Sequence, residues 1–198
     1  RPDCFPQKID ICVPTRNGLP KWWLKNLERL PVNKVIVDYS KPLGEARRKL
    51  IQKVETEWFL FLDDDVLVGK DWFKEAILHI KEDVAAVDTR EQYRCHGEKL
   101  DRALNELRWA GGDYPLRFGD RGRTVCTLLR ASVVKDWKPS RPDLSSWEDY
   151  ELTQHVIKQG MKWMDVNAHA IHYGWGFLQT IRKARWHIEG LKRIRPVS

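Results

Sequence analysis

Trp58-Phe-Leu-Phe-Leu62, followed directly by Asp63-Asp-Asp65, is the stretch that decides the fold. An uninterrupted apolar run of this length is typical of a parallel strand that is buried on both faces. The run ends abruptly in adjacent carboxylates, which repel one another unless a cation compensates their charge. In open α/β sheets, ligands bind at the carboxyl ends of the strands. The stretch therefore predicts a buried strand that delivers an acidic cluster to a ligand site.

Strands and helices alternate on both sides of this stretch. We expect strands at 9–13, 34–39 and 84–88, and helices at 20–30, 44–54 and 70–81. This rhythm predicts a single α/β domain with a mostly parallel central sheet flanked by helices. The ends of the strands should bring Thr15, Asp38 and the acidic cluster to one crevice.

The second half of the chain is less regular. We expect helices at 98–109 and 147–159, a polar loop at 117–123, and strands at 124–129 and 162–166. Beyond them, apolar and basic residues alternate through 177–194. The predicted organisation is a domain over residues 1–176 and a basic amphipathic helix over 177–198. That helix either packs on the domain or lies on a membrane surface.

The bulk composition limits the class of protein. The chain has 198 residues, a formal charge of +7 and four cysteines without a CxxC pair. This length suits one well-buried domain, and the charge favours anionic partners. The cysteine usage favours a reducing compartment. No apolar run approaches the roughly 20 residues that span a bilayer, and no signal peptide opens the chain. We therefore expect a cytoplasmic protein, with the cytoplasmic membrane surface as the alternative.

Three groups of residues carry metal or acid–base chemistry. Asp63 and Asp65 can direct oxygens toward Mg²⁺ or Mn²⁺, whereas a helix cap would explain only one of the acids. Glu148 and Asp149 open a predicted helix, where a carboxylate taken alone is most often a cap. His172 follows the last predicted strand and is a candidate metal ligand.

The order of these groups carries a family resemblance. Seven short segments follow one another along residues 9–173. They are Val13-Pro-Thr-Arg-Asn17, Val35-Ile-Val-Asp38, Ala46-Arg47, Phe61-Leu-Asp-Asp-Asp65, Leu128-Leu-Arg130, Trp147-Glu-Asp-Tyr-Glu-Leu152 and His172. This series resembles glycosyltransferase family 2, whose members have the Rossmann-like GT-A fold and carry DxD and ED motifs. The resemblance implies an inverting, metal-dependent sugar transfer from a UDP- or GDP-sugar to an acceptor hydroxyl.

The resemblance also implies roles for individual residues. Those expected to bind the nucleotide are Thr15, Arg16, Asp38, Arg47, Asp63 and Asp64. Asp65 and His172 match metal-binding positions, and Asp149 matches the catalytic base, with Glu148 beside it. For the acceptor side we expect Trp109, Gly112, Asp113 and Trp147. Tyr39 and Arg48 stand where the family often has Asp and Asn, so the choice of donor stays open.

Other classes remain open on the sequence alone. A sugar-phosphate nucleotidyltransferase would need a glycine-rich loop after the first strand, where only Gly18 stands. A nucleic-acid-binding protein would fit the positive charge, but acid clusters at strand ends would repel a phosphate backbone. A non-catalytic sugar-binding relative is a third alternative. We expect a nucleotide-sugar donor and a glycan or lipid-linked acceptor as partners, and no nucleic acid.

Overall fold

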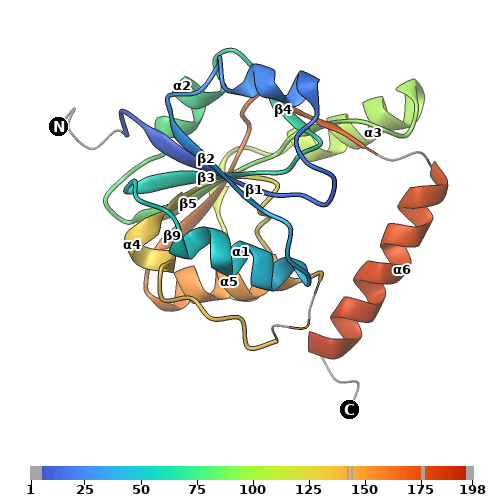
Figure 1. The fold of residues 1–198 in the computed structure, drawn as a ribbon. Coiled ribbons are helices and arrows are strands. Elements are labelled where there is room, and N and C mark those ends of the chain that lie inside the picture. Colours follow the sequence, from blue (N-terminus) through green and yellow to red (C-terminus); the bar gives the residue numbers. More distant parts are fainter. Residues whose placement is uncertain (1–5, 142, 144, 175–176, 195–198) are drawn as a thin grey trace.

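The computed structural model describes residues 6–141, 143, 145–174 and 177–194 of the chain. Its centre is a seven-stranded sheet in the order β2-β1-β3-β8-β5-β9-β7 (Figure 1). The strands are β1 (Ile9–Pro14), β2 (Val32–Asp38), β3 (Trp58–Leu62), β5 (Val84–Thr89), β7 (Tyr114–Pro115), β8 (Cys126–Arg130) and β9 (Lys162–Val166). The helices are the 3₁₀ helix η2 (Lys21–Asn26), α1 (Leu43–Gln52), α2 (Trp72–Ile77), α3 (Glu98–Trp109), α4 (Ala131–Val134), α5 (Glu148–Lys158) and α6 (Phe177–Ile194).

The central sheet is mostly parallel, as the sequence predicts. β1, β2, β3, β5 and β9 run in one direction, because β8 pairs antiparallel with both β3 and β5. β7 is antiparallel to β9 at the edge of the sheet. The expected α/β architecture with a single GT-A-like domain is therefore confirmed.

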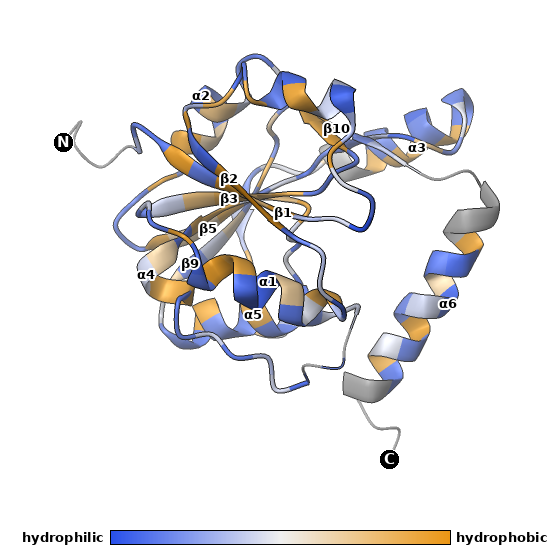
Figure 2. Ribbon diagram, viewed as in Figure 1, coloured by the Kyte–Doolittle hydropathy of each residue, from blue (hydrophilic) through white to orange (hydrophobic). Residues whose placement is uncertain are grey.

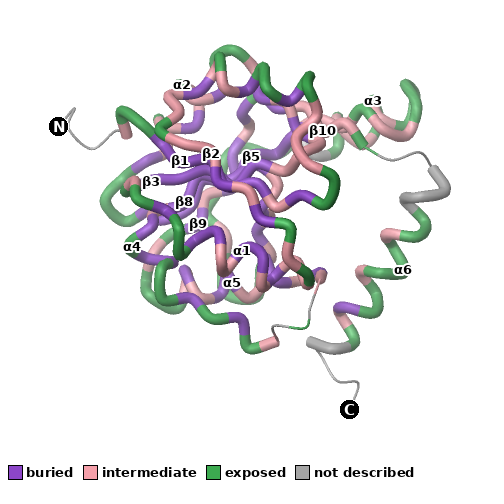
Figure 3. The backbone as a smooth tube through the Cα atoms, viewed as in Figure 1, coloured by how far each residue is buried: buried purple, intermediate pink, exposed green. Residues whose placement is uncertain are grey.

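Helices cover both faces of this sheet (Figure 1). Every residue of β3 is buried. Phe59 and Phe61 pack in the core beneath α1, α4 and α5. Leu60 and Leu62 pack in the opposite core, with tryptophans from η2 and α2. The hydrophobic colouring of Figure 2 and the buried residues of Figure 3 both concentrate on these strands. Since a fully buried large apolar side chain contributes about 1.5–3 kcal/mol, β3 is a main source of stability.

The sequence did not predict a second, three-stranded sheet in the order β4-β10-β6. Its strands are β4 (Val66–Val68), β6 (Gln92–Arg94) and β10 (Ala170–Tyr173). β4 begins directly after the acidic cluster, and β10 pairs antiparallel with it, with His172 opposite Val66. His172 therefore lies inside a strand rather than in a loop after the last strand, and this pairing brings it to the acidic cluster.

Two predicted helices are shorter in the structure. The helix expected at 20–30 is only the 3₁₀ helix η2, which ends at Asn26. The buried Asn26 amide donates to the carbonyl of Val66 at 3.0 Å and accepts the N–H of Val68 at 2.9 Å. It thereby satisfies backbone groups of β4 that would otherwise be buried without partners. The helix expected at 70–81 is α2, which ends at Ile77 and continues only as turns.

The C-terminal helix α6 lies along the side of the domain (Figure 1). It is tied there by hydrogen bonds from the Trp147 indole to the His187 carbonyl at 2.8 Å and from the Ser146 hydroxyl to the Trp186 carbonyl at 3.4 Å. Gly190 is buried at this contact, and a Cβ in its place would lie 2.1 Å from the Ser146 hydroxyl. Residues 195–198 of the predicted helix lie outside the described residues. Among the described residues, none of the helices is both long and apolar enough to cross a membrane.

Candidate active site

The carboxyl ends of β1, β2 and β3 meet as expected. Thr15 follows β1, and its hydroxyl donates to the Asp64 carboxylate. Its backbone N–H donates to the Asp38 carbonyl at 3.1 Å. The Asp38 carboxylate, at the end of β2, is buried and accepts the N–H of Ser40 at 2.8 Å. Burial raises its pKa, but these hydrogen bonds and the nearby lysine charges outweigh burial and hold the pKa below its ordinary value. Three separate strand ends therefore present polar side chains at one edge of the sheet, and two of these ends, those of β2 and β3, carry carboxylates.

Arg47 joins Asp63 of the acidic cluster to Glu148 at the start of α5. This residue of α1 is buried, and its Nε donates to Glu148 Oε1 at 3.1 Å. One terminal nitrogen donates to the Thr124 carbonyl at 2.9 Å, and the other lies 3.5 Å from Asp63 Oδ1. Burial raises the pKa of Asp63 to about 7, although the Arg47 charge opposes it. Burial and then Asp149 raise the pKa of Glu148 as well. A single guanidinium thus holds both acidic pairs together.

Asp65 faces His172. Asp65 Oδ2 lies 3.1 Å from His172 Nε2, and the other imidazole nitrogen is 3.8 Å from Glu91 Oε1. Burial lowers the pKa of His172, but the neighbouring Asp65 and Glu91 carboxylates outweigh burial and raise it to about 10. His172 is therefore a cation at neutral pH, and it would lose a proton on becoming a metal ligand.

The Asp65–His172 pair fits a divalent ion. Asp65 Oδ1 is buried and has no hydrogen-bond partner among the described residues. A buried carboxylate oxygen without a partner is costly, and a hard cation would satisfy it. The imidazole beside it supplies a nitrogen ligand after deprotonation. These observations are consistent with the Mn²⁺ or Mg²⁺ site expected from the sequence.

Asp149 is bound by an arginine that the sequence did not single out. Arg121 donates from Nε and Nη2 to the two carboxylate oxygens of Asp149, both at 2.8 Å. The guanidinium lies 4.3 Å from the Trp147 ring centroid. Trp147 has a left-handed backbone with φ of 70°, which is uncommon for a bulky residue. Such conformations concentrate at functional sites, and this one aims the indole at Arg121.

The other residues expected on the acceptor side lie elsewhere. The Gly112 carbonyl accepts from Arg90 at 2.8 Å, and Asp113 accepts the backbone N–H of Asn167 at 2.8 Å. Among the described residues, neither has a recorded contact with Asp63, Asp65 or Asp149. The side chain of Trp109 lies outside the described residues. Among the members of this group whose side chains the structure describes, only Trp147 lies beside Glu148 and Asp149. Arg16, expected at the nucleotide, is exposed after β1.

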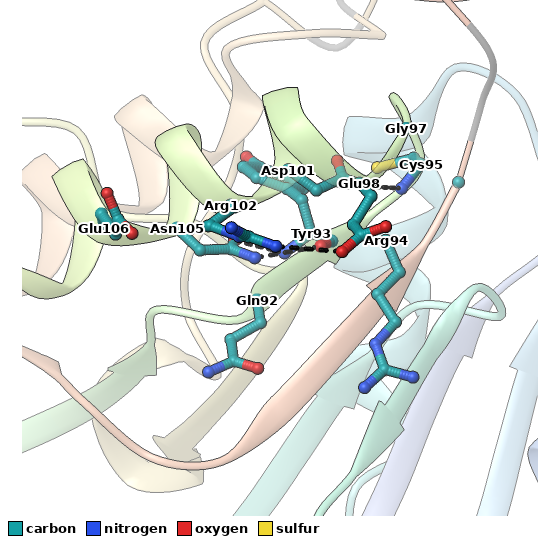
Figure 4. Close-up of a pocket in the computed structure, with 11 residues that line it drawn as sticks. Gln92, Tyr93, Arg94, Cys95, Gly97, Glu98, Asp101, Arg102, Asn105 and Glu106 are labelled. Carbon is teal, nitrogen blue, oxygen red and sulfur yellow. Dashed lines mark hydrogen bonds and ion pairs between the residues drawn. The ribbon is translucent and has the colours of Figure 1, made fainter.

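A second group of metal-ligating side chains lies apart from these carboxylates. Cys95, His96 and Asp101 have ligand atoms within 4.8 Å of one another. Cys95 and Asp101 line a cavity of about 930 Å³ between β6 and α3 (Figure 4). The Asp101 carboxylate accepts the backbone N–H groups of Cys95 and His96, each at 3.0 Å. These contacts hold the turn that leads into α3, so Asp101 already has a structural role.

Glu91 belongs to a buried network of charged side chains. Arg123 lies 3.4 Å from Asp88 and from Glu91, and 3.3 Å from Asp165. Arg90 adds a contact of 2.9 Å to Asp165. These three carboxylates lie together in the interior, where the charge of each disfavours ionisation of its neighbours. Burial raises the pKa of Asp88 to about 7, although Arg123 opposes it.

This network predicts a pH-dependent stability. Asp88 keeps its proton in the folded state up to about pH 7, whereas an unfolded aspartate loses it near pH 4. Stability should therefore fall as pH rises between these values, by at most about 1.4 kcal/mol per pH unit. Urea unfolding of the wild type and Asp88→Asn across this range tests the sign, because the wild-type curve should decline relative to the variant. Parallel curves would contradict the assignment.

Taken together, the fold and site define an α/β enzyme that presents two acidic pairs and a basic network at the carboxyl edge of a parallel sheet. Residues 23–133, more than half of the chain, match the model of glycosyl transferase family 2, and the chain belongs to that family. The matched segment contains Asp38, Arg47 and the acidic cluster, and it ends before Glu148. No curated protein matches the chain. Family membership supports glycosyl transfer from a nucleotide-sugar donor, in preference to nucleotidyl transfer or nucleic-acid binding.

Proposed function

We propose that this protein is an inverting, divalent-metal-dependent glycosyltransferase that moves a sugar from a UDP- or GDP-sugar to an acceptor hydroxyl. The observation that carries the proposal is the contact series from Asp63 through Arg47 to Glu148. It ties the DxD acids to the ED acids at one edge of the sheet. The donor and the base would therefore meet where a single displacement requires them.

In the proposed reaction, Asp149 accepts the proton of the acceptor hydroxyl. The acceptor oxygen bonds to the anomeric carbon as the bond from that carbon to the diphosphate breaks, and the electron pair leaves on the phosphate oxygen. Asp65 and His172 would hold Mn²⁺ or Mg²⁺, which as a Lewis acid stabilises the leaving diphosphate.

The nucleoside end of the donor would lie along the ends of β1 to β3. Thr15 and Asp38 would hold the base and Asp63 the ribose, with Asp64 oriented by its hydrogen bond from Thr15. Arg16, which is exposed after β1, would approach the nucleotide from the open side. The buried Arg47 would act by fixing Asp63 and Glu148 in place.

Calorimetric titration of UDP and GDP, each with and without Mn²⁺, tests the donor and the metal together. We expect one nucleotide to bind in the presence of Mn²⁺ and this binding to fall at least tenfold in Asp65→Ala, because the carboxylate that holds the ion is lost. Asp71→Ala is a suitable control, since Asp71 is an exposed acid further along the same segment. Binding that is equally strong without metal, or unchanged in Asp65→Ala, would contradict the metal site.

We also propose that α6 is docked on the domain by one face and rests on an anionic membrane surface by the other. Its outward residues combine apolar side chains with cations: Ile181, Arg182, Arg185, Ile188 and Lys192 are exposed. Apolar contact together with basic charge is the combination that binds anionic lipid. This arrangement would bring the site to a lipid-linked acceptor at the cytoplasmic surface; a soluble glycan acceptor would need no such contact.

Vesicle flotation tests this arrangement. The wild type should float with vesicles that contain phosphatidylglycerol, and Ile188→Glu should reduce the bound fraction several-fold, because it places an acid on the apolar side of the helix. Leu107→Glu is the matched control, since Leu107 is equally apolar and exposed on α3. Absence of binding at low salt would contradict the proposal.

A further inference from the structure

Three hydrogen bonds hold the Asp149 carboxylate in this structure. Arg121 occupies both carboxylate oxygens, and the backbone N–H of Tyr150 donates to Oδ1 at 2.9 Å. A general base must direct a lone pair at the hydroxyl that it deprotonates. The bidentate pair with a guanidinium is also the strongest form of this contact. Arg121 thus occupies the side of the carboxylate that lies between its two oxygens, and an acceptor hydroxyl gains this approach when Arg121 turns away from at least one of them.

The backbone on either side of Arg121 is fixed to α5. The N–H of Gly119 donates to the Gln154 amide at 3.0 Å, and the same amide donates to the Asp120 carbonyl at 2.7 Å. The N–H of Gly122 donates to the Thr153 hydroxyl at 3.0 Å. Gly122 also lies against Trp163, since a Cβ there would be 2.4 Å from the ring. With the backbone held at both sides, release of Asp149 must come from rotation of the Arg121 side chain.

One face of α6 brings two nitrogen-bearing side chains toward Arg121 and the acidic cluster. Lys183, His187 and Gly190 recur at the spacing of one helix face, and Gly190 is buried against Trp147. His187 lies close enough to Arg121 that burial first, and then the Arg121 charge, lower its pKa. Its Nδ1 is enclosed and has no hydrogen-bond partner among the described residues. Lys183 is close enough to Asp65 and Asp63 for their charges to raise its pKa, although burial lowers it overall.

We propose that Arg121 is an anion-binding residue for the acceptor, and that the acceptor carries a phosphate group. The phosphate takes the guanidinium from Asp149, with His187 as a second donor, and so frees the carboxylate beside the acceptor hydroxyl. The guanidinium lies over the Trp147 ring, and this contact would keep its orientation as it changes partner. Guanidinium geometry matches phosphate oxygens as well as it matches a carboxylate, so the exchange keeps a bidentate contact. This inference rests on the proposed function through the role of Asp149 as the base.

Binding of inorganic phosphate to the full chain, without nucleotide or divalent metal, tests the proposal. Phosphorus NMR line widths should show saturable binding by the wild type and binding at least tenfold weaker by Arg121→Met, which keeps the length of the side chain but not its charge. Arg121→Lys should retain part of the affinity as a point charge. Arg117→Met is the matched control, because Arg117 is an exposed arginine of the same loop, and it should bind phosphate like the wild type.

The proposal would be overturned if, with inorganic phosphate and with phosphatidic acid vesicles alike, the wild type showed no saturable binding or bound no better than Arg121→Met. Because this assay omits nucleotide and metal, its failure is distinguishable from failure of the proposed sugar transfer. The source of the phosphate is separated by comparing inorganic phosphate with vesicles of phosphatidic acid and with vesicles of phosphatidylglycerol at equal charge. A response to Arg121 substitution only with phosphatidic acid would identify a lipid phosphate, and a response with inorganic phosphate a soluble one.

Discussion

Replacing Asp149 with asparagine should lower kcat by about 10²- to 10⁴-fold, which is the usual contribution of a general base. Asparagine keeps the size of the side chain but cannot take the proton of the acceptor hydroxyl. Donor binding should change little, because the residues proposed for the nucleotide lie at the ends of β1 to β3. Release of nucleoside diphosphate, with water or an added hydroxyl compound as acceptor, measures the turnover.

Glu151→Gln is the matched control for Asp149→Asn. Glu151 lies on the same first turn of α5, but its carboxylate points outward to the backbone N–H of Ser140 at 2.9 Å. The control removes the same charge from the start of the helix, so any general effect on the helix dipole appears in both variants. Near-normal turnover by Asp149→Asn would exclude Asp149 as the base and would also remove the basis of the acceptor inference.

Replacing Arg47 with methionine should destabilise the fold by about 3–5 kcal/mol, the usual effect of removing one partner of a buried ion pair. Methionine fills much of the same volume but leaves the buried Glu148 without its cation and the Thr124 carbonyl without its donor. Urea unfolding followed by circular dichroism measures the loss. Nucleotide binding should weaken as well, because Asp63 loses its contact with the guanidinium.

Arg48→Met supplies the control for Arg47→Met in the same helix. Arg48 pairs with Glu45 at the surface, where an ion pair contributes at most about 1 kcal/mol. The double variant Arg47→Met/Glu148→Gln should recover part of the lost stability, because the buried charge is then removed with its partner. Equal losses of unfolding free energy in Arg47→Met and Arg48→Met would show that the buried ion pair contributes no more to stability than the surface pair.

The parts of the fold that repeat a simple period could be predicted from the sequence. The apolar run of β3 and the helix α1 lie within a residue or two of their expected positions, because core burial dictates their side chains. The contact of Thr15 with the acidic cluster also follows from parallel strands that end at one edge. The match over residues 23–133 shows the family, and the roles of Asp65, Asp149 and His172 are proposals that their positions support.

Other parts of the fold and of the site could not be predicted, because they form through contacts between distant segments that leave no pattern in the local sequence. β4, β6 and β10 are short strands of three or four residues each, and pairing between distant segments, rather than periodicity, forms them. The η2 segment has helical spacing, but the side chain of Asn26 serves β4 instead. Arg121 lies in a polar loop that contains other arginines, and nothing in the sequence distinguishes it from them. The structure shows that it binds Asp149 and lies over the Trp147 ring. Gly122, two residues before the strand predicted at 124–129, is closely packed against Trp163, but a glycine in a polar loop does not by itself predict this contact.

The antiparallel strand β8 has a consequence for how the chain is made. β3 and β5 do not pair with each other, because β8 lies between them and pairs with both. During synthesis, the apolar β3 therefore has an open edge until residues 126–130 have been added. An unpaired apolar edge is a site of aggregation, and pairing over such a sequence distance is slow. A ribosome-bound chain that stops before β8 should need protection by a chaperone, whereas one that includes β8 has both halves of the sheet joined.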